Sequence, residues 1–172
     1  VGGDIESFAT LGAEALRVRG HGQPLDRPLD AAVDHVMQGF PELSVHPDVV
    51  EGVRDLSELG IRLVTLSNGS ASVAAALLQG AGVRDRFERL LTVEDAGVWK
   101  PASGAYAYAL GECGVESMDA MLVAVHPWDI DGARRAGLAT AWIDRSGGPY
   151  PSYFGTPDVR VASLPELADA LR

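Results

Sequence analysis

The fold of this chain is decided by the stretch Leu122-Val123-Ala124-Val125-His126-Pro127-Trp128-Asp129-Ile130-Asp131-Gly132-Ala133. Its apolar first residues predict a buried strand, the His-Pro-Trp-Asp sequence predicts a turn, and the residues that follow predict a helix. In open α/β sheets, ligands bind just beyond the carboxyl ends of the strands. A strongly apolar strand that ends in His126, Trp128 and Asp129 therefore indicates a binding site at this point of the chain.

The same alternation of strand and helix runs from Pro47 to the C-terminus. Strands are expected at 62–66, 87–93, 121–125, 140–143 and 159–161, and helices at 49–59, 71–79, 104–111, 129–136 and 164–171. Strands joined by helical crossovers predict an α/β fold with a doubly wound, mostly parallel, Rossmann-like sheet. The first 46 residues show two apolar helical faces and no strand. We therefore expect residues 1–46 to form part of a helical cap and residues 47–172 to form the core.

Composition narrows the classes of function. The 172 residues carry a net charge of −10, which argues against nucleic acid or an anionic membrane surface as a partner. No apolar run reaches the roughly 20 residues that a membrane-spanning helix needs. The one cysteine, Cys113, excludes a disulfide within the chain and fits a reducing, cytoplasmic setting.

Polar groups follow three successive predicted strands. Ser67 and Asn68 end the first, Lys100 follows the second, and Asp129 follows the third. Taken singly, each has an ordinary interpretation: a helix N-cap for Ser67, Asn68 or Asp129, a solvated loop lysine for Lys100, and a structural histidine for His126. Parallel strands present their carboxyl ends at one edge of a sheet, so we expect these groups to meet in one anion-binding site.

Four motifs carry a resemblance to a known family. They are Leu66-Ser67-Asn68-Gly69-Ser70, Trp99-Lys100-Pro101 with Tyr106, His126 to Ala133, and Thr140-Ala141-Trp142-Ile143-Asp144-Arg145. Together they resemble the haloacid dehalogenase superfamily and, within it, the type II (L-2-haloacid) dehalogenases. The resemblance implies hydrolysis of a small 2-halo carboxylic acid without a metal or other cofactor. In that family an aspartate on the first strand displaces halide from C2, and water hydrolyses the resulting ester.

The resemblance also implies roles for the catalytic residues. Ser67 and Asn68 would hold the substrate carboxylate and the ester oxyanion. Lys100 would balance the charge of the attacking aspartate. Asp129 would orient or activate water and fix Lys100.

Other residues would line the substrate. Trp128, Tyr106 and, from the cap, Phe8 would form an apolar wall around the halogenated carbon. The chain departs from the family at Ala124 and His126, where type II enzymes usually carry Ser and Asn. This places the His126 imidazole among the substrate-facing groups and leaves open a different substrate or activity.

The phosphatases of the same superfamily are the disfavoured alternative. They use a Gly-Asp pair at the end of the equivalent strand to hold Mg²⁺, which prefers carboxylate oxygens. Ala124 stands where that aspartate would fall, and Asp129 beside Lys100 is a weak Mg²⁺ site. A metal-free reaction is therefore the favoured interpretation.

The larger departure concerns the nucleophile. No Asp-x-x-x-Thr motif follows an apolar strand before the cap, and Asp4 does not qualify because Val1-Gly2-Gly3 is no strand. We expect this N-terminally truncated chain to lack the first strand, the nucleophile, the first half of the cap and the arginine that takes up halide. It would then be inactive alone, and a non-catalytic module that binds small carboxylates is the second hypothesis.

A missing first strand has a physical consequence. That strand would lie between the strands ending at Ser67 and Val125, so its absence leaves two interior edges unpaired. We expect the isolated chain to be marginally stable or aggregation-prone, or the sheet to be completed by an upstream segment or by another copy. Tyr150, Tyr153 and Phe154 are candidates for a homodimer interface, and surface packing explains them equally well.

Overall fold

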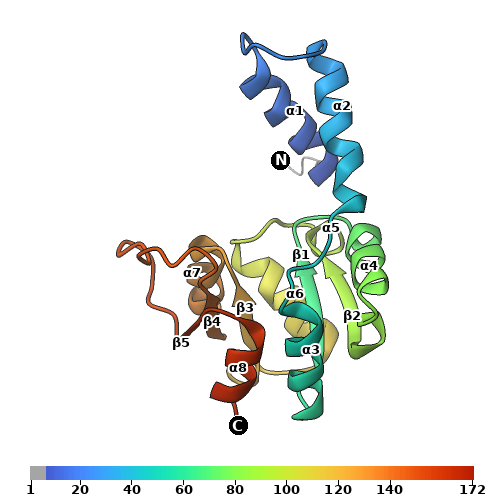
Figure 1. Cartoon of the computed structure of the whole chain (residues 1–172). Coiled ribbons are helices and arrows are strands. Elements are labelled where there is room, and N and C mark those ends of the chain that lie inside the picture. The colour runs from blue at the N-terminus through green and yellow to red at the C-terminus, as the bar shows by residue number, and fades with distance from the viewer. Residues whose placement is uncertain (1–6) are drawn as a thin grey trace.

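A computed structural model describes residues 7–172 of the chain (Figure 1). Asp4 and the rest of the first six residues, which the sequence assigns to the cap, lie outside the described residues. Among the helices of the described range, none combines the length and the apolar character that crossing a bilayer requires.

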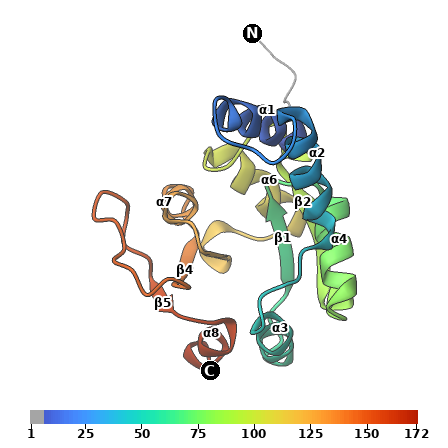
Figure 2. The ribbon, with the colours of Figure 1, turned by 45° about the horizontal axis from the view of Figure 1, so that its top comes forward.

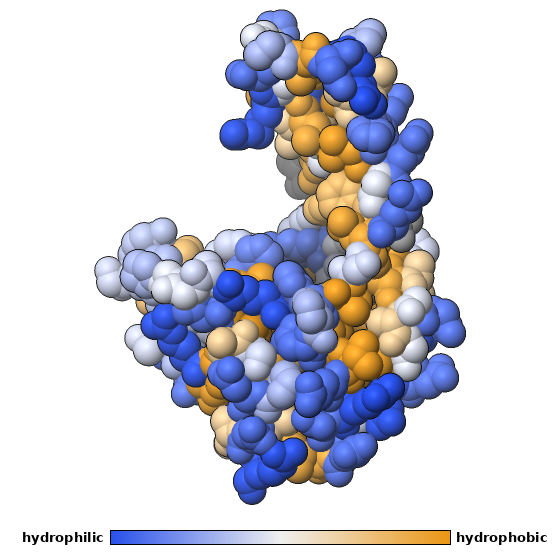
Figure 3. Space-filling model, in the orientation of Figure 1, coloured by the Kyte–Doolittle hydropathy of each residue, from blue (hydrophilic) through white to orange (hydrophobic). Residues whose placement is uncertain are grey.

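Two helices form a hairpin that stands away from the rest of the chain in Figure 1 and lies in front of α6 in the turned view of Figure 2. They are α1 (Phe8–Gly20) and α2 (Leu29–Gly39), and Val33 is the buried residue of α2. Other apolar side chains of the hairpin remain exposed (Figure 3), among them Leu11 and Val36. The helical content predicted for this region is therefore present, with much of its apolar surface uncovered.

The remaining elements form the α/β fold that the sequence predicts. In chain order they are η1 (Phe40–Glu42), α3 (Val49–Glu58), β1 (Leu63–Ser67), α4 (Ala71–Gly80), η2 (Arg84–Arg86), β2 (Phe87–Thr92), α5 (Val93–Ala96), α6 (Ser103–Cys113), η3 (Ser117–Asp119), β3 (Met121–Ala124), α7 (Pro127–Arg135), β4 (Ala139–Ile143), β5 (Val159–Val161) and α8 (Leu164–Ala170). The five strands and the helices between them lie within one or two residues of the expected positions. The single helical turn α5 is not among the helices expected from the sequence. The Thr92 side chain caps it by accepting a hydrogen bond from Asp95 N.

The strands form two parallel sheets. β1 pairs with β2, with Ser67 opposite Thr92. β3, β4 and β5 form the second sheet, in that order, with Ala124 opposite Trp142. Parallel pairing confirms the predicted fold class. Within residues 7–172, β1 and β3 each have a partner on one side only, so the strands form two sheets that are divided at the two edges expected to be unpaired.

Helix packing and an ion pair at the start of α3 help to join the two sheets. α3, which precedes β1, packs on α8, which follows β5, and a Cβ on Gly52 would come within 2.2 Å of Leu164 Cβ. Asp48, just before α3, accepts hydrogen bonds from Arg145 at 2.8 and 3.1 Å and from Leu164 N at 2.9 Å. Burial raises the pKa of Asp48, but the Arg145 guanidinium and the Leu164 N–H outweigh it and lower that pKa. Asp48 therefore remains a carboxylate that ties both sheets together.

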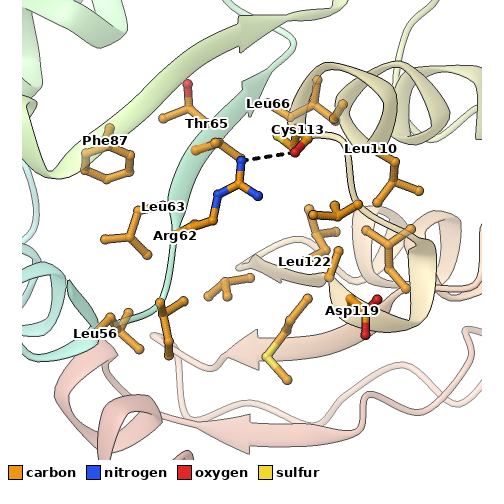
Figure 4. Close-up of a pocket in the computed structure, with 18 of the residues that line it drawn as sticks. Leu56, Arg62, Leu63, Thr65, Leu66, Phe87, Leu110, Cys113, Asp119 and Leu122 are labelled. Atoms are coloured by element: carbon orange, nitrogen blue, oxygen red, sulfur yellow. Dashed lines mark hydrogen bonds between the residues drawn. The ribbon is translucent and has the colours of Figure 1, made fainter. Parts of the chain in front are cut away.

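An apolar cavity of about 770 Å³ separates β1 from β3. Leu63 and Leu66 of β1 and Leu122 of β3 surround it (Figure 4). Lys100 and Tyr106 also line it. The cavity thus follows the facing edges of the two sheets and reaches the polar groups at their carboxyl ends.

The contact between α3 and α8 gives a stability prediction. Gly52→Ala should lower the free energy of unfolding by about 1–3 kcal/mol, because the added methyl group collides with Leu164 and the backbone of Pro165. Urea unfolding followed by circular dichroism measures this change.

Gly111→Ala is the matched control. Gly111 lies inside α6 with nothing within 4 Å of an added Cβ, so alanine should stabilise the helix by roughly 0.5–1 kcal/mol. Equal effects of the two substitutions would contradict the close α3–α8 packing.

Candidate active site

A buried ion pair lies at the carboxyl edge of the sheets. Lys100 Nζ donates to Asp129 Oδ2 at 2.6 Å, and the two side chains are 9% and 5% exposed. Lys100 lies in the loop between α5 and α6, and Asp129 lies in the first turn of α7. A buried pair is stable only where further hydrogen bonds satisfy its remaining polar atoms. The neighbouring residues provide those bonds.

Tyr106 holds the other oxygen of Asp129. Its fully buried side chain donates to Asp129 Oδ1 at 2.6 Å. Burial, followed by the hydrogen bond to Asp129, raises the pKa of Tyr106 well above its ordinary value. A Cβ on Gly132 would lie 2.6 Å from both the Tyr106 hydroxyl and Pro101 Cβ. The absence of a side chain at Gly132 therefore permits this approach.

Asn68 and Ser67 lie beside the pair. Asn68 Oδ1 accepts from Lys100 N at 3.2 Å, and its Nδ2 donates to Lys100 O at 3.4 Å. The amide of Asn68 thus holds the backbone from which the Lys100 side chain extends. Ser67 Oγ accepts from Gly69 N at 2.8 Å, a bond that uses an oxygen lone pair and leaves the hydroxyl proton free to donate.

His126 and Trp128 form the rim of the site next to Asp129. His126 is the N-cap residue of α7, and its side chain makes no capping hydrogen bond. Its exposed ring packs on the half-buried Trp128 with ring centroids 5.2 Å apart and planes 33° apart. The site therefore combines a buried, hydrogen-bonded charge pair with a partly exposed aromatic rim.

Comparison with known proteins identifies the family. A sequence model described as haloacid dehalogenase-like hydrolase matches residues 2–137. The (S)-2-haloacid dehalogenase of Pseudomonas sp. (strain YL) is 33% identical over 92% of this chain and 68% of the relative. The chain belongs to the haloacid dehalogenase-like hydrolases. Haloacetate dehalogenase H-2 of Moraxella sp. (strain B) is 30% identical over 92% of the chain and 70% of the relative.

Solved structures of the family support the same assignment. A crystal structure of an L-2-haloacid dehalogenase superposes with a TM-score of 0.89 at 28% identity, covering 99% of this chain and 74% of that one. A dehalogenase described with an intermediate complex gives a TM-score of 0.87 at 28% identity over 96% of this chain and 73% of that one. The haloacid dehalogenase-like fold therefore extends over nearly the whole chain.

The structure corrects the ordinary interpretations of three polar groups. The N-cap of α4 is Ser70, which accepts from Ser72 N, rather than Ser67 or Asn68. Asp129 is not a cap either, since its two oxygens bind Lys100 and Tyr106. Lys100 is not a solvated loop lysine, because its side chain is 9% exposed. The three polar turns of this haloacid dehalogenase-like chain thus converge as the sequence predicts.

The residues expected to form an apolar wall differ in placement. The Phe8 ring packs edge-on against Phe40, with centroids 5.9 Å apart. The Tyr106 ring lines the cavity, but its hydroxyl binds Asp129. The main contact of the Tyr106 hydroxyl is therefore its hydrogen bond to Asp129. Substrate contact by Phe8 remains a prediction.

Gly132 is a site residue that the sequence analysis passed over. Its signal is position: a glycine three residues after Asp129 lies one helical turn further along the same face. Recognising its importance also required knowing that Tyr106 crosses this point of α7. Across residues 7–172, no three His, Cys, Asp or Glu side chains gather closely enough to hold a metal ion.

Tyr106→Phe tests the hydrogen bond to Asp129. Removing the hydroxyl leaves Asp129 Oδ1 buried without its donor, so the free energy of unfolding should fall by about 1–3 kcal/mol. Tyr153→Phe is the control, because that side chain is 81% exposed and should leave the unfolding midpoint unchanged.

The alkaline limb of the stability curve gives a second measurement. Above the ordinary tyrosine pKa of 10.0, the unfolded chain loses the Tyr106 proton while the folded chain retains it. Stability therefore falls as pH rises above that value, and this fall should be shallower in Tyr106→Phe. Parallel curves for the wild type and the variant would contradict the buried hydroxyl.

Proposed function

We propose that this chain serves in the hydrolytic dehalogenation of small 2-halo carboxylic acids. The observation that carries the proposal is the buried arrangement of Lys100, Asp129 and Tyr106 at the carboxyl edge of the sheets. The names of the relatives, (S)-2-haloacid dehalogenase and haloacetate dehalogenase, support the same chemistry. The net reaction converts the 2-halo acid and water into the 2-hydroxy acid, halide and a proton.

Substrate binding is assigned to the polar turn after β1 and to the rim. The free hydroxyl proton of Ser67 donates to the substrate carboxylate. Asn68 contributes by fixing the Lys100 backbone. Trp128 and His126 lie beside the C2 carbon and the halogen of the substrate. Phe8, on the hairpin, covers the same substrate atoms. These contacts place the substrate carboxylate near hydrogen-bond donors that replace the water molecules of its hydration shell.

The covalent step requires a carboxylate other than Asp129. Both Asp129 oxygens accept strong hydrogen bonds, which makes that group a poor nucleophile. We assign the attack to an aspartate on an extended strand seated in the cavity between β1 and β3, facing Lys100. Its oxygen forms a bond to C2 as the carbon–halogen bond breaks, and the halide leaves with the electron pair.

Hydrolysis completes the reaction. Water polarised by Asp129 attacks the ester carbonyl carbon of the aspartate, and Lys100 and Ser67 stabilise the oxyanion. The bond between that carbon and the ester oxygen breaks, one proton of the water passes to the departing oxygen and the other to solvent, and the 2-hydroxy acid and the aspartate carboxylate are released. The residues act here by positioning groups and stabilising charge, so we propose a metal-free reaction.

A binding module without turnover is the second candidate. Within the described part of the chain, the carboxylate placed against Lys100 is Asp129, whose oxygens are both occupied. Such a chain would hold a small carboxylate through Ser67 and release it unchanged. We further propose a cytoplasmic location, consistent with the single Cys113, and a homodimer that includes the exposed Tyr153.

Halide release tests the enzymatic proposal. The chain extended at its N-terminus by a segment that supplies the first strand with its Asp-x-x-x-Thr motif, the first half of the cap and the halide-binding arginine should release chloride from 2-chloropropionate in the presence of EDTA. The unextended chain should remain at background. Lys100→Met in the extended protein should lower kcat at least a hundredfold, because the developing charges lose their cation. Background release by a folded, extended protein would contradict the dehalogenase assignment.

Carboxylate binding tests the anion site separately. Calorimetry with lactate should show that Ser67→Ala weakens binding by about tenfold, since one hydrogen bond to a charged group is lost. Ser152→Ala, in an exposed loop, is the control and should bind as the wild type does. Binding without turnover in the extended protein would favour the binding module.

A further inference from the structure

The loop between β4 and β5 binds along α7, the helix that carries Asp129. We call residues 144–158 the strap. The Tyr150 hydroxyl donates to Gly155 O at 2.9 Å, and Gly155 N donates to Asp131 Oδ1 of α7 at 2.9 Å. Arg134, near the end of α7, pairs with Asp158 at 3.5 Å. The strap therefore fixes α7 at its middle and at its end.

Trp142 fixes the beginning of the same helix. Its indole, at the end of β4, is 5% exposed and donates from Nε1 to Val125 O at 3.0 Å. The Tyr150 hydroxyl lies 3.4 Å from Pro127 O. These two carbonyl groups flank His126 on either side. The turn that leads into α7 is thus held from β4 and from the strap.

The indole itself is held on two sides. The Tyr150 ring meets it edge-on with centroids 4.9 Å apart. Arg160 Cζ lies 4.7 Å from the centroid of the indole ring. Arg160 is in turn fixed by Asp144 at 2.6 Å and by Gly148 O at 3.0 Å. Trp142 is therefore a rigid donor.

The turn that leads into α7 is stabilised only weakly by its own residues. Its N-cap, His126, makes no side-chain hydrogen bond to α7, and Pro127 has no N–H. Two residues later, Asp129 must place each oxygen 2.6 Å from its donor. A shift of about 1 Å in the turn would break that arrangement and can cost a hundredfold in rate.

We infer that Trp142 is a positioning residue for the site. Its hydrogen bond to the Val125 carbonyl fixes the turn and thereby the position of Asp129 relative to Lys100. Tyr150 and the rest of the strap hold Trp142 in place. The inference rests on the proposed function for its catalytic meaning.

Trp142→Phe tests the inference in the full chain. Phenylalanine keeps an aromatic ring against Tyr150 and loses the Nε1 donor. Lactate affinity, measured by calorimetry, should fall about three- to tenfold. The ¹⁵N–¹H signal of the Lys100 ammonium, which the ion pair protects from exchange with water, should broaden or vanish. A second variant, Tyr150→Phe, removes the hydroxyl and should move both quantities in the same direction.

Val161→Ala is the matched control, because it removes packing from β5 without touching the turn. It should lower the unfolding midpoint and leave the Lys100 signal and lactate affinity unchanged. If Trp142→Phe and Tyr150→Phe both keep the wild-type signal, the inference is wrong. If the wild type shows the Lys100 signal but binds no lactate, the proposed function is wrong. The positioning role of Trp142 is then still tested by comparing the Lys100 signal of the two variants with that of the wild type.

Discussion

The site depends on a single buried ion pair. Lys100 and Asp129 are nearly inaccessible to water, so each charge requires the other and every remaining polar atom requires a partner. Tyr106 satisfies the second oxygen of Asp129, and Asn68 fixes the backbone of Lys100. Gly132 makes room for the Tyr106 hydroxyl. The choice of residue at three further positions, Tyr106, Asn68 and Gly132, thus follows from one electrostatic requirement.

The neutrality of this pair shapes how the site can bind an acid. Because Asp129 offsets much of the charge of Lys100, an approaching carboxylate is attracted less strongly than it would be by an unpaired lysine. The chain as a whole carries a charge of −10, which also disfavours an anion. Under the proposed function, short-range donors such as the Ser67 hydroxyl therefore supply part of the binding.

The sequence predicts the helices and strands and the meeting of the site residues at one edge of the sheets. It does not predict most of the hydrogen bonds within the site. Strand and helix positions follow from hydrophobic periodicity, and parallel strands bring Lys100 and Asp129 to one edge. Periodicity says nothing of which serine caps α4, because Ser67 and Ser70 are both eligible and the choice depends on backbone geometry. It also cannot reveal that the Tyr106 hydroxyl reaches Asp129, since that contact depends on how α6 crosses α7. The division of the sheet was expected only through the family resemblance.

The two sheets and the site share the same connections. Asn68 follows β1, Lys100 follows β2 and Asp129 follows β3, so the bonds among them also join the sheets at their carboxyl edge. Beyond these polar links, the α3–α8 contact and the Asp48–Arg145 pair hold the sheets together. A strand seated between β1 and β3 would pair with both edges and cover the apolar cavity. Under the proposed function, completing the sheet and delivering the nucleophile to Lys100 are the same event, so folding and catalysis are coupled through one segment.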